Sequence, residues 1–286
     1  MRHWVLYVCR ALLVLGIIPP PLLNAQEEGR STVNRTVPFE LLSNFLVVVR
    51  GQIGNLDGLK LILDTGTTNS VIDWKVAEKL RLQRHPGKVM NFVSHIPVEW
   101  ADVPELGIGP IRAEAVRVMV VRLAEYSELA ENADGIIGLD LLGRSDALTI
   151  DYEKRLISFR SAEHGIDHPD PPPCFKVPIV VQGLDLHLVV DTGFQGILLY
   201  RDRLRKRLPL LRTEGESTIV TMRRTQATRV KLPGVRIGGP EETITVVMMD
   251  GPDERTLPGV DGYLGPAALH AKRIEFDFAA RVLRWE

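Results

Sequence analysis

The chain has 286 residues, of which 45% are hydrophobic and 25% are charged, a composition typical of globular proteins. Its formal charge is −1, and it becomes −3 without residues 1–25, which contain Arg2 and Arg10 but no acidic residue. A weakly acidic chain has no electrostatic attraction to nucleic acid or to an anionic membrane, so we expect neither as a partner.

The first 25 residues have the layout of a secretory signal peptide. Basic residues up to Arg10 precede a short apolar stretch at 11–18, and then come three prolines and the sequence LLNA. We expect cleavage after Ala25. The alternative is a membrane anchor, but a span needs about 20 consecutive apolar residues, and Arg10 and the prolines leave fewer. The sequence therefore predicts an exported protein, periplasmic or secreted, with no stable membrane span.

Cysteine and histidine give no sign of a disulfide or a metal site. Cys9 lies in the expected signal peptide, so Cys174 remains alone and can form no internal disulfide. We interpret Cys174 as a small buried side chain, because no histidine motif accompanies it. His164 and His168 are spaced like metal ligands on a helix, but they lie among prolines, and we interpret them as part of a solvated linker.

The chain contains a tandem duplication. LKLILDTGTTNSVI recurs as LHLVVDTGFQGILL, and ADGIIGLDLL recurs as VDGYLGPAAL, each 127 residues further on. A segment rich in proline and charge, 161–173, separates the two copies. We therefore predict an N-terminal lobe at 26–160 with the first DTG loop, a linker at 161–173, and a C-terminal lobe at 174–286 with the second.

Within each copy the local signals are mostly those of β-strands. Runs rich in Val, Ile and Leu alternate with Gly, Pro, Asn and Asp; the runs are 45–49, 59–63, 115–121, 177–181, 186–190 and 243–249. Asp57 and Gly58 predict a hairpin turn, and Asp73 predicts the N-cap of a short helix that begins at Trp74. The class is mainly β, without the spacing of βαβ units.

Each DTG motif sets an aspartate at the end of an apolar strand, where ionisation is costly unless hydrogen-bond donors are close. We expect Gly66 and Gly193 to permit a positive φ and a close backbone approach, and the hydroxyls of Thr65 and Thr192 to tie each loop to a neighbour. If the copies pair about a pseudo-twofold axis, the two aspartates meet and share one proton. Such a pair can act on water as general acid and base.

On the motifs LDTGTT with GIIG and VDTGFQG with GYLG, the sequence resembles the aspartic proteases of the pepsin and retropepsin superfamily, in a bacterial single-chain form. The resemblance covers about residues 36–286. It implies two lobes related by a pseudo-twofold axis, each a retropepsin-like β-barrel. It also implies a peptide or protein substrate, no cofactor, no metal and a monomer. The residues it implies are Asp64 and Asp191 as the catalytic pair and Thr65, Thr192, Gly66, Gly193, Gly138 and Gly265 as their support.

The two loops differ in one position. Thr67 follows the first DTG, and we expect its hydroxyl to hydrogen-bond the outer oxygen of Asp64, whereas Phe194 at the equivalent place cannot. The pair is therefore predicted to be asymmetric, and which aspartate holds the proton stays open. The resemblance implies two flap hairpins, which by position would lie near 92–98 and 222–227.

Three functions compete at this stage. The leading hypothesis is an aspartic endopeptidase. The alternative is a non-catalytic peptide-binding or partner-binding module on the same fold, because a fold does not guarantee its chemistry. A third, narrower hypothesis is a processing enzyme that acts on one partner and not on generic substrates.

Overall fold

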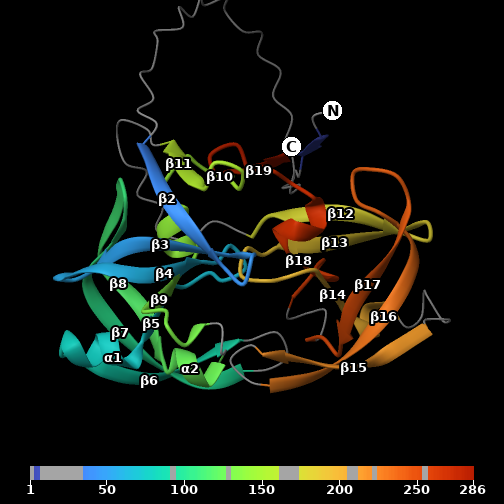
Figure 1. The fold of residues 1–286 in the computed structure, drawn as a ribbon. Helices are drawn as coiled ribbons and strands as arrows, with labels where there is room; N and C mark the ends of the chain where they lie inside the picture. The colour runs from blue at the N-terminus through green and yellow to red at the C-terminus, as the bar shows by residue number, and fades with distance from the viewer. Residues whose placement is uncertain are drawn as a thin grey trace, which may run out of the picture.

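The computed structural model describes residues 3–6, 35–90, 95–126, 130–160, 174–204, 212–220, 224–252 and 257–286. Within these residues the chain is mainly β, as predicted, and its strands form two sheets (Figure 1). We call residues 35–160 the first half and residues 174–286 the second half. Of the expected signal peptide, only the strand β1 (His3–Leu6) falls within the described residues. The expected linker falls outside them.

The first half is built from strands with short helices between them. Its strands are β2 (Arg35–Leu42), β3 (Leu46–Ile53), β4 (Leu56–Leu63), β5 (Val71–Asp73), β6 (Arg84–Met90), β7 (His95–Ile108), β8 (Ile111–Val121), β9 (Gly135–Ile137), β10 (Ala147–Asp151) and β11 (Leu156–Arg160). Its helices are α1 (Trp74–Lys79), α2 (Leu123–Tyr126) and α3 (Leu139–Leu142).

The second half repeats most of this order. Its strands are β12 (Lys176–Val181), β13 (Leu184–Val190), β14 (Ile197–Tyr200), β15 (Arg212–Val220), β16 (Arg224–Arg236), β17 (Glu242–Met249), β18 (Gly262–Leu264), β19 (Arg273–Asp277) and β20 (Val282–Trp285). Its helices are α4 (Arg201–Leu204) and the 3₁₀ helix η2 (Pro266–Leu269).

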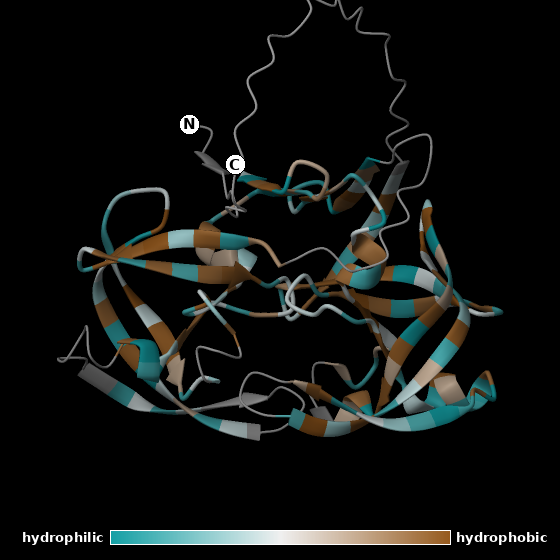
Figure 2. Cartoon of the chain, turned by 180° about the vertical axis from the view of Figure 1, so that it is seen from behind, coloured by the Kyte–Doolittle hydropathy of each residue, from teal (hydrophilic) through white to brown (hydrophobic). Residues whose placement is uncertain are grey.

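Alternation of apolar and polar residues explains why these segments are strands. In β7, Ile96 and Val98 are buried, whereas Pro97 and Glu99 are exposed, so one face of the strand packs on the protein and the other faces solvent. Figure 2 shows the same alternation as bands along many strands. All six apolar runs identified in the sequence fall in strands, to within one residue at their ends.

The hairpin turn between β3 and β4 lies at residues 54–55, and the prediction of a turn at Asp57 and Gly58 was wrong. Gly54 has a φ of 56° and Gly58 a φ of 70°, so both glycines adopt the left-handed conformation that a turn requires. The chain turns at the first of them. Gly58 lies within β4, opposite a register shift in β3.

The predicted helix N-cap is confirmed. The carboxylate of Asp73 accepts a hydrogen bond from the backbone N–H of Lys75 at 2.9 Å, at the start of α1. Its second oxygen accepts the N–H of Leu123 at 2.9 Å, which ties α1 to the start of α2.

The two halves share one strand arrangement around their DTG motifs. In the first half, β4 pairs in parallel with β9, with Leu61 opposite Gly135. In the second half, β13 pairs in parallel with β18, with Leu188 opposite Gly262. Both partners in the second pair are 127 residues further along the chain than those in the first. The spacing of the sequence repeat is therefore also the spacing of the strand pairs.

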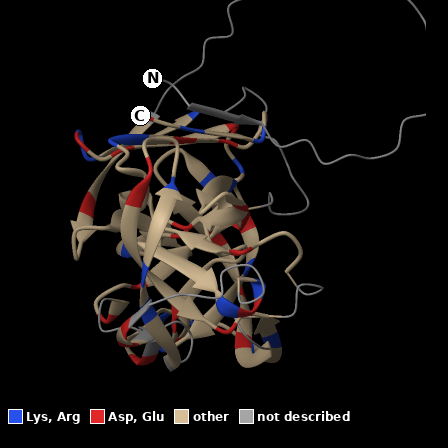
Figure 3. Ribbon diagram, turned by 90° about the vertical axis from the view of Figure 1, so that its right-hand side faces the viewer, with Lys and Arg blue, Asp and Glu red and all other residues tan. Residues whose placement is uncertain are grey.

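A six-stranded part of the larger sheet joins the halves, in the order β1-β20-β19-β10-β11-β2. The contact across it is β10 with β19, antiparallel from Ala147–Asp277 to Asp151–Arg273. Ion pairs cross this contact: Arg160 lies 2.9 Å from Asp277, and Arg284 lies 2.7 Å from Glu275 and 3.0 Å from Asp277. In Figure 3, basic and acidic residues lie close together near the C terminus.

One hydrophobic core runs through both halves, and each half has a second, smaller cluster. The smaller cluster of the first half is aliphatic and includes Ile62, Val98 and Met119. That of the second half includes Tyr200 and Tyr263. Successive residues of a strand point to opposite faces, so Ile62 lies on the face opposite Leu61 and Leu63 of the main core.

The flap hairpins implied by the resemblance correspond to β6–β7 and β15–β16, which pair antiparallel along their lengths. Their tips, residues 91–94 and 221–223, lie outside the described residues. No helix in the described part of the chain has the length and apolarity to span a membrane.

Candidate active site

The two DTG aspartates occupy equivalent positions at the ends of equivalent strands. Asp64 follows β4 and donates its backbone N–H to the carbonyl of Ile137, and Asp191 follows β13 and donates its N–H to the carbonyl of Leu264, both at 3.0 Å. Because side chains alternate along a strand, Asp64 shares the face of Ile62 and points away from the main core.

The threonines of the two motifs bind each other's loops. The backbone N–H of Thr65 donates to Oγ1 of Thr192 at 3.1 Å, and the N–H of Thr192 donates to Oγ1 of Thr65 at 3.2 Å. The hydroxyls in turn donate across to backbone carbonyls, Thr65 to Val190 at 2.8 Å and Thr192 to Leu63 at 2.9 Å. Both threonines are buried, so these four bonds fix the two strand ends against each other.

The glycines of the two motifs each lie against the opposite aspartate. A Cβ atom on Gly66 would collide with the carboxyl group of Asp191, and a Cβ atom on Gly193 would lie 2.9 Å from Oδ2 of Asp64. Neither glycine has a positive φ, so that part of the sequence expectation was wrong. The need for glycine at these positions is steric, because any side chain would separate the carboxyl groups.

The two carboxyl groups lie side by side but have different hydrogen-bond partners. Oδ1 of Asp64 accepts the N–H of Gly66 at 2.8 Å and the N–H of Thr67 at 3.1 Å. Oδ1 of Asp191 accepts only the N–H of Gly193, at 2.7 Å, among the residues that the structure describes. Two donors stabilise a negative charge better than one, so the pair is polarised toward an ionised Asp64.

The pKa values follow the same asymmetry. Burial raises the pKa of Asp64, but the N–H groups of Gly66 and Thr67 and a hydrogen bond from Asp191 lower it again. Burial and the neighbouring charge of Asp64 hold the pKa of Asp191 well above its usual range. The shared proton therefore resides on Asp191, which donates it to Asp64. Two carboxyl groups this close cannot both ionise, as is general for aspartic-protease dyads that share one proton.

The hydroxyl of Thr67 does not bond Asp64, contrary to expectation. It donates to the carbonyl of Asn69 at 3.2 Å, and it is the backbone N–H of Thr67 that reaches Asp64. In the second half, the N–H of Phe194 donates to the backbone carbonyl of Asp191 at 3.2 Å instead of to its side chain. The asymmetry of the pair thus arises from the course of the backbone and not from a side-chain hydroxyl.

Gly138 and Gly265 lie behind the two loops, and both permit a close backbone approach. A Cβ on Gly138 would lie 2.8 Å from the carbonyl carbon of Asn69 and 3.0 Å from its oxygen, and a Cβ on Gly265 would collide with the carbonyl of Phe194. The loop and the segment behind it are therefore in direct backbone contact in each half.

The first loop has a polar support that the sequence analysis missed. Oγ of Ser70 donates to Oδ1 of Asp140 at 2.6 Å, and the backbone N–H of Ser70 donates to Oδ2 at 2.8 Å. Oγ of Ser70 also accepts the N–H of Gly138 at 3.0 Å. Burial raises the pKa of Asp140, and the bonds from Ser70 partly offset this effect. The signal in the sequence was an acidic residue within the apolar run LDLL.

The second carboxylate pair noted in the sequence, Asp134 and Asp261, is structural. Oδ2 of Asp134 accepts the N–H of Lys60 at 2.8 Å, and Oδ2 of Asp261 accepts the N–H of His187 at 2.9 Å. Each carboxylate thus secures the strand that leads into its DTG loop.

Cys174 and Tyr263 lie close enough to the aspartates to sense their charge. Burial raises the pKa of the Cys174 thiol to about 11, with contributions from the charges of Asp191 and Asp64. Burial also raises the pKa of Tyr263, with a contribution from Asp191. The thiol is therefore protonated at neutral pH and is a poor nucleophile, in line with the sequence interpretation.

No group of three or more His, Cys, Asp or Glu side chains in the described residues is arranged to hold a metal ion. Residues 49–141 match the family model described as aspartyl protease, a stretch that contains the first DTG loop and Gly138. A comparison with curated proteins found no match.

Proposed function

Since residues 49–141 place this chain among the aspartyl proteases of the retropepsin-like family, we propose that it is an aspartic endopeptidase whose catalytic pair is Asp64 and Asp191. The observation that carries the proposal is the meeting of two carboxyl groups from distant parts of the chain. They are linked by a hydrogen bond, and each is bordered by a glycine of the opposite loop.

In the proposed reaction the ionised Asp64 accepts a proton from a water molecule, whose oxygen attacks the carbonyl carbon of the scissile peptide bond. Asp191 gives its proton to the carbonyl oxygen, on which negative charge develops. The resulting diol collapses when Asp64 returns its proton to the amide nitrogen, which leaves as an amine, and a diol hydroxyl returns a proton to Asp191. Protons balance over the cycle, and water is the only co-reactant.

The wider arrangement also belongs to this proposal. We propose that the two halves are pseudo-symmetric lobes, 26–160 and 174–286, which together complete one site in a monomer. The repeated strand pairs and the reciprocal threonine bonds support it. We further propose export by removal of residues 1–25. The mass of the N-terminal peptide of protein collected from a secreting bacterial host tests this step.

Substitution of each aspartate tests the reaction. Asp64→Asn and Asp191→Asn are each expected to lower the rate of hydrolysis of casein and of a peptide library by at least about 10³-fold, because neither variant can move both protons. Asp185→Asn, an exposed change outside the loops, is the matched control and should retain full activity. Unchanged proteolysis in either loop variant would refute the proposal.

A pH series with a statine-type transition-state mimic separates this function from the alternative. Turnover at some pH together with binding of the mimic supports the protease. If the mimic binds and no peptide in the library is cleaved at any pH, a non-catalytic peptide-binding module would be favoured.

A further inference from the structure

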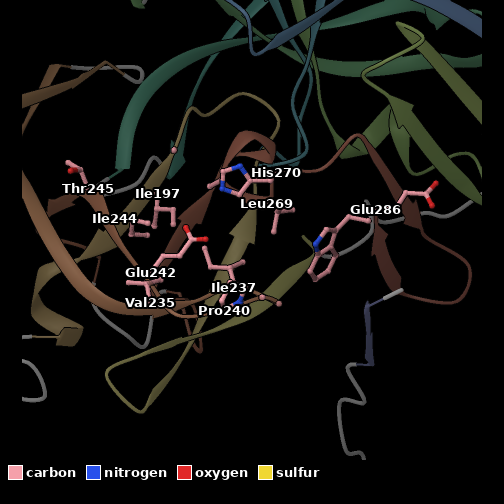
Figure 4. Close-up of a pocket in the computed structure, with 15 residues that line it drawn as sticks. Ile197, Val235, Ile237, Pro240, Glu242, Ile244, Thr245, Leu269, His270 and Glu286 are labelled. Carbon is pink, nitrogen blue, oxygen red and sulfur yellow. The ribbon is translucent and has the colours of Figure 1, made fainter. Parts of the chain in front are cut away.

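The second half contains an apolar pocket of about 480 Å³ that the proposed reaction does not use. It lies between the turn at 238–240, the helix η2 and the end of β20. Its inner surface is apolar, and the carboxylates of Glu242 and Glu286 and the imidazole of His270 are exposed around it (Figure 4). The apolar lining residues include Ile197, Val235, Ile237, Ile244, Leu269 and Trp285.

The equivalent place in the first half is filled. Leu141 of α3, which is fully buried, stands where the second half has Ala268. A Cβ on Gly109, in the turn that matches 238–240, would collide with Val37 of β2. The strand β2 therefore covers this surface in the first half, and the larger leucine fills what remains of the space.

The neighbouring strand edges show what kind of segment fits. The outer edge of β11 pairs antiparallel with β2, with Val37 opposite Ile157. The outer edge of β20 pairs antiparallel with β1, with Val5 opposite Leu283. Both edges thus accept an extended segment in the same register. Because β1 belongs to the segment that we propose is removed on export, the mature chain would leave the β20 edge open beside the pocket.

We propose that the β20 edge and this pocket form a docking site for an extended segment of the protein substrate, outside the segment that is cleaved. The register of β2 places an aliphatic residue, Val or Ile, opposite Leu283. Charge complementarity places Lys or Arg three residues earlier, opposite Glu286. Glu242 has no ion pair within the described part of the chain, so a second carboxylate is available to a basic group. The docked segment adds a strand to the sheet through backbone hydrogen bonds.

The identity of the partner as a substrate rests on the proposed function, whereas the docking of a segment does not. The chain itself contains the expected spacing, because Arg2 precedes Val5 by three residues. A fluorescent peptide with the sequence of residues 1–8 is therefore a suitable probe.

The binding test uses the full chain with Asp64→Asn, which removes turnover, and with Trp4→Pro and Val5→Pro. Adjacent prolines remove the ladder N–H in either register, so β1 cannot occupy the edge. We expect the probe to bind, and to bind at least about tenfold more weakly when Ala268→Leu fills the pocket as Leu141 does in the first half. Ala267→Leu, an exposed neighbour that does not line the pocket, is the matched control and should bind like its parent.

Three results would overturn the docking site: no binding of the probe, equal binding by the Ala268→Leu chain, or self-association of the chain in place of probe binding. A control probe with Arg2→Glu and Val5→Asp should bind at least about tenfold more weakly, because both recognition positions are lost. Equal binding of this control would also contradict the proposal.

The kinetic test uses the chain with both aspartates. We expect that adding the segment to a cleaved peptide lowers KM about tenfold with kcat unchanged, and that Ala268→Leu cancels this gain. Cleavage without any gain would refute the substrate role. Probe binding by the Asp64→Asn chain, with no cleavage of any peptide by the parent, would refute the proposed function and leave a docking site for another protein.

Discussion

The two DTG loops share one backbone plan and differ in how many polar groups support them. The first loop gives its aspartate two N–H donors and has the Ser70–Asp140 pair behind it. The second gives its aspartate one donor, and Ile197 and Ala267 stand where the first half has Ser70 and Asp140. Duplication thus kept the parts that bring the carboxyl groups together, while the surroundings that set their charges differ.

This difference gives each aspartate a separate role. A carboxylate with two backbone donors is stabilised as an anion, and a buried carboxyl with one donor beside that anion keeps its proton. The general base and the general acid are therefore assigned before substrate binds. Four predictions test the comparison, beginning with the largest effect.

Gly66→Ala should destabilise the protein more than Gly193→Ala. The added methyl group collides with Asp191 in the first case, and in the second its closest contact is 2.9 Å from Asp64. We expect losses in the free energy of unfolding of about 3 kcal/mol and about 1 kcal/mol, in the range for overpacked sites. Urea unfolding followed by circular dichroism measures both. Equal losses would show that the loops are closer to symmetric than the structure indicates.

Thr65→Val and Thr192→Val should have equal effects, because each removes one hydroxyl from the same reciprocal arrangement. Each leaves a buried carbonyl and a buried N–H without a partner, which costs about 2 kcal/mol in the free energy of unfolding. The double variant should lose less than the sum, since the two hydroxyls serve the same contact. A double-mutant cycle by urea unfolding measures this. Strict additivity would contradict the reciprocal bonding.

The pH dependence of stability should come more from Asp191 than from Asp64. Both pKa values are raised by folding, so the folded protein keeps protons that the unfolded chain has released. The free energy of unfolding should therefore fall as pH rises above about 4, by up to about 1.4 kcal/mol per pH unit for each proton kept, until the folded pKa is passed.

Asp191→Asn should flatten this slope more than Asp64→Asn does, because the pKa of Asp191 is raised further. Urea titrations from about pH 4 to about pH 8 measure the slopes. Asp277 acts in the opposite sense: burial raises its pKa, but bonds from Ala280, Arg160 and Arg284 lower it below its usual value. It is common to all variants, so it does not affect their comparison. A steeper slope in Asp191→Asn would reverse the assignment of the proton.

Thr67→Val and Phe194→Thr should have the smallest effects. The Thr67 hydroxyl bonds Asn69 and not Asp64, so its loss should change kcat by less than about threefold and leave the pH profile of activity in place. The side chain at 194 supplies no bond to Asp191 in the structure, so a hydroxyl there should not equalise the pair. A shift of the acidic limb in either variant would show that side chains at these positions set the asymmetry after all.

Much of the fold was predictable, because it follows from local pattern. The apolar runs became strands, Asp73 capped α1, and the repeat of 127 residues became a repeat of strand pairs. The parallel pairing of β4 with β9 was not predictable, since these strands are short and far apart in the chain. Nor was the joining of β10 to β19, because strand edges carry no sequence signal for their partner.

The site was predictable as a set of residues but not as a set of bonds. The motif identified the aspartates, threonines and glycines. It could not show that the glycines are needed for space and not for φ, or that the N–H and not the hydroxyl of Thr67 reaches Asp64. These details depend on how the two loops face each other across the halves. The Ser70–Asp140 pair was missed because its members are 70 residues apart.

The sheet shared by the two halves also bears on how the chain could be divided. A fragment that ends at Arg160 would leave the backbone of β10 without β19 and would separate Arg160 from Asp277. Conversely, a single cut between residues 160 and 174 would leave the β10–β19 ladder, the ion pairs and the threonine bonds unbroken. The nicked protein should therefore migrate as one particle on a sizing column and separate into two pieces only after denaturation.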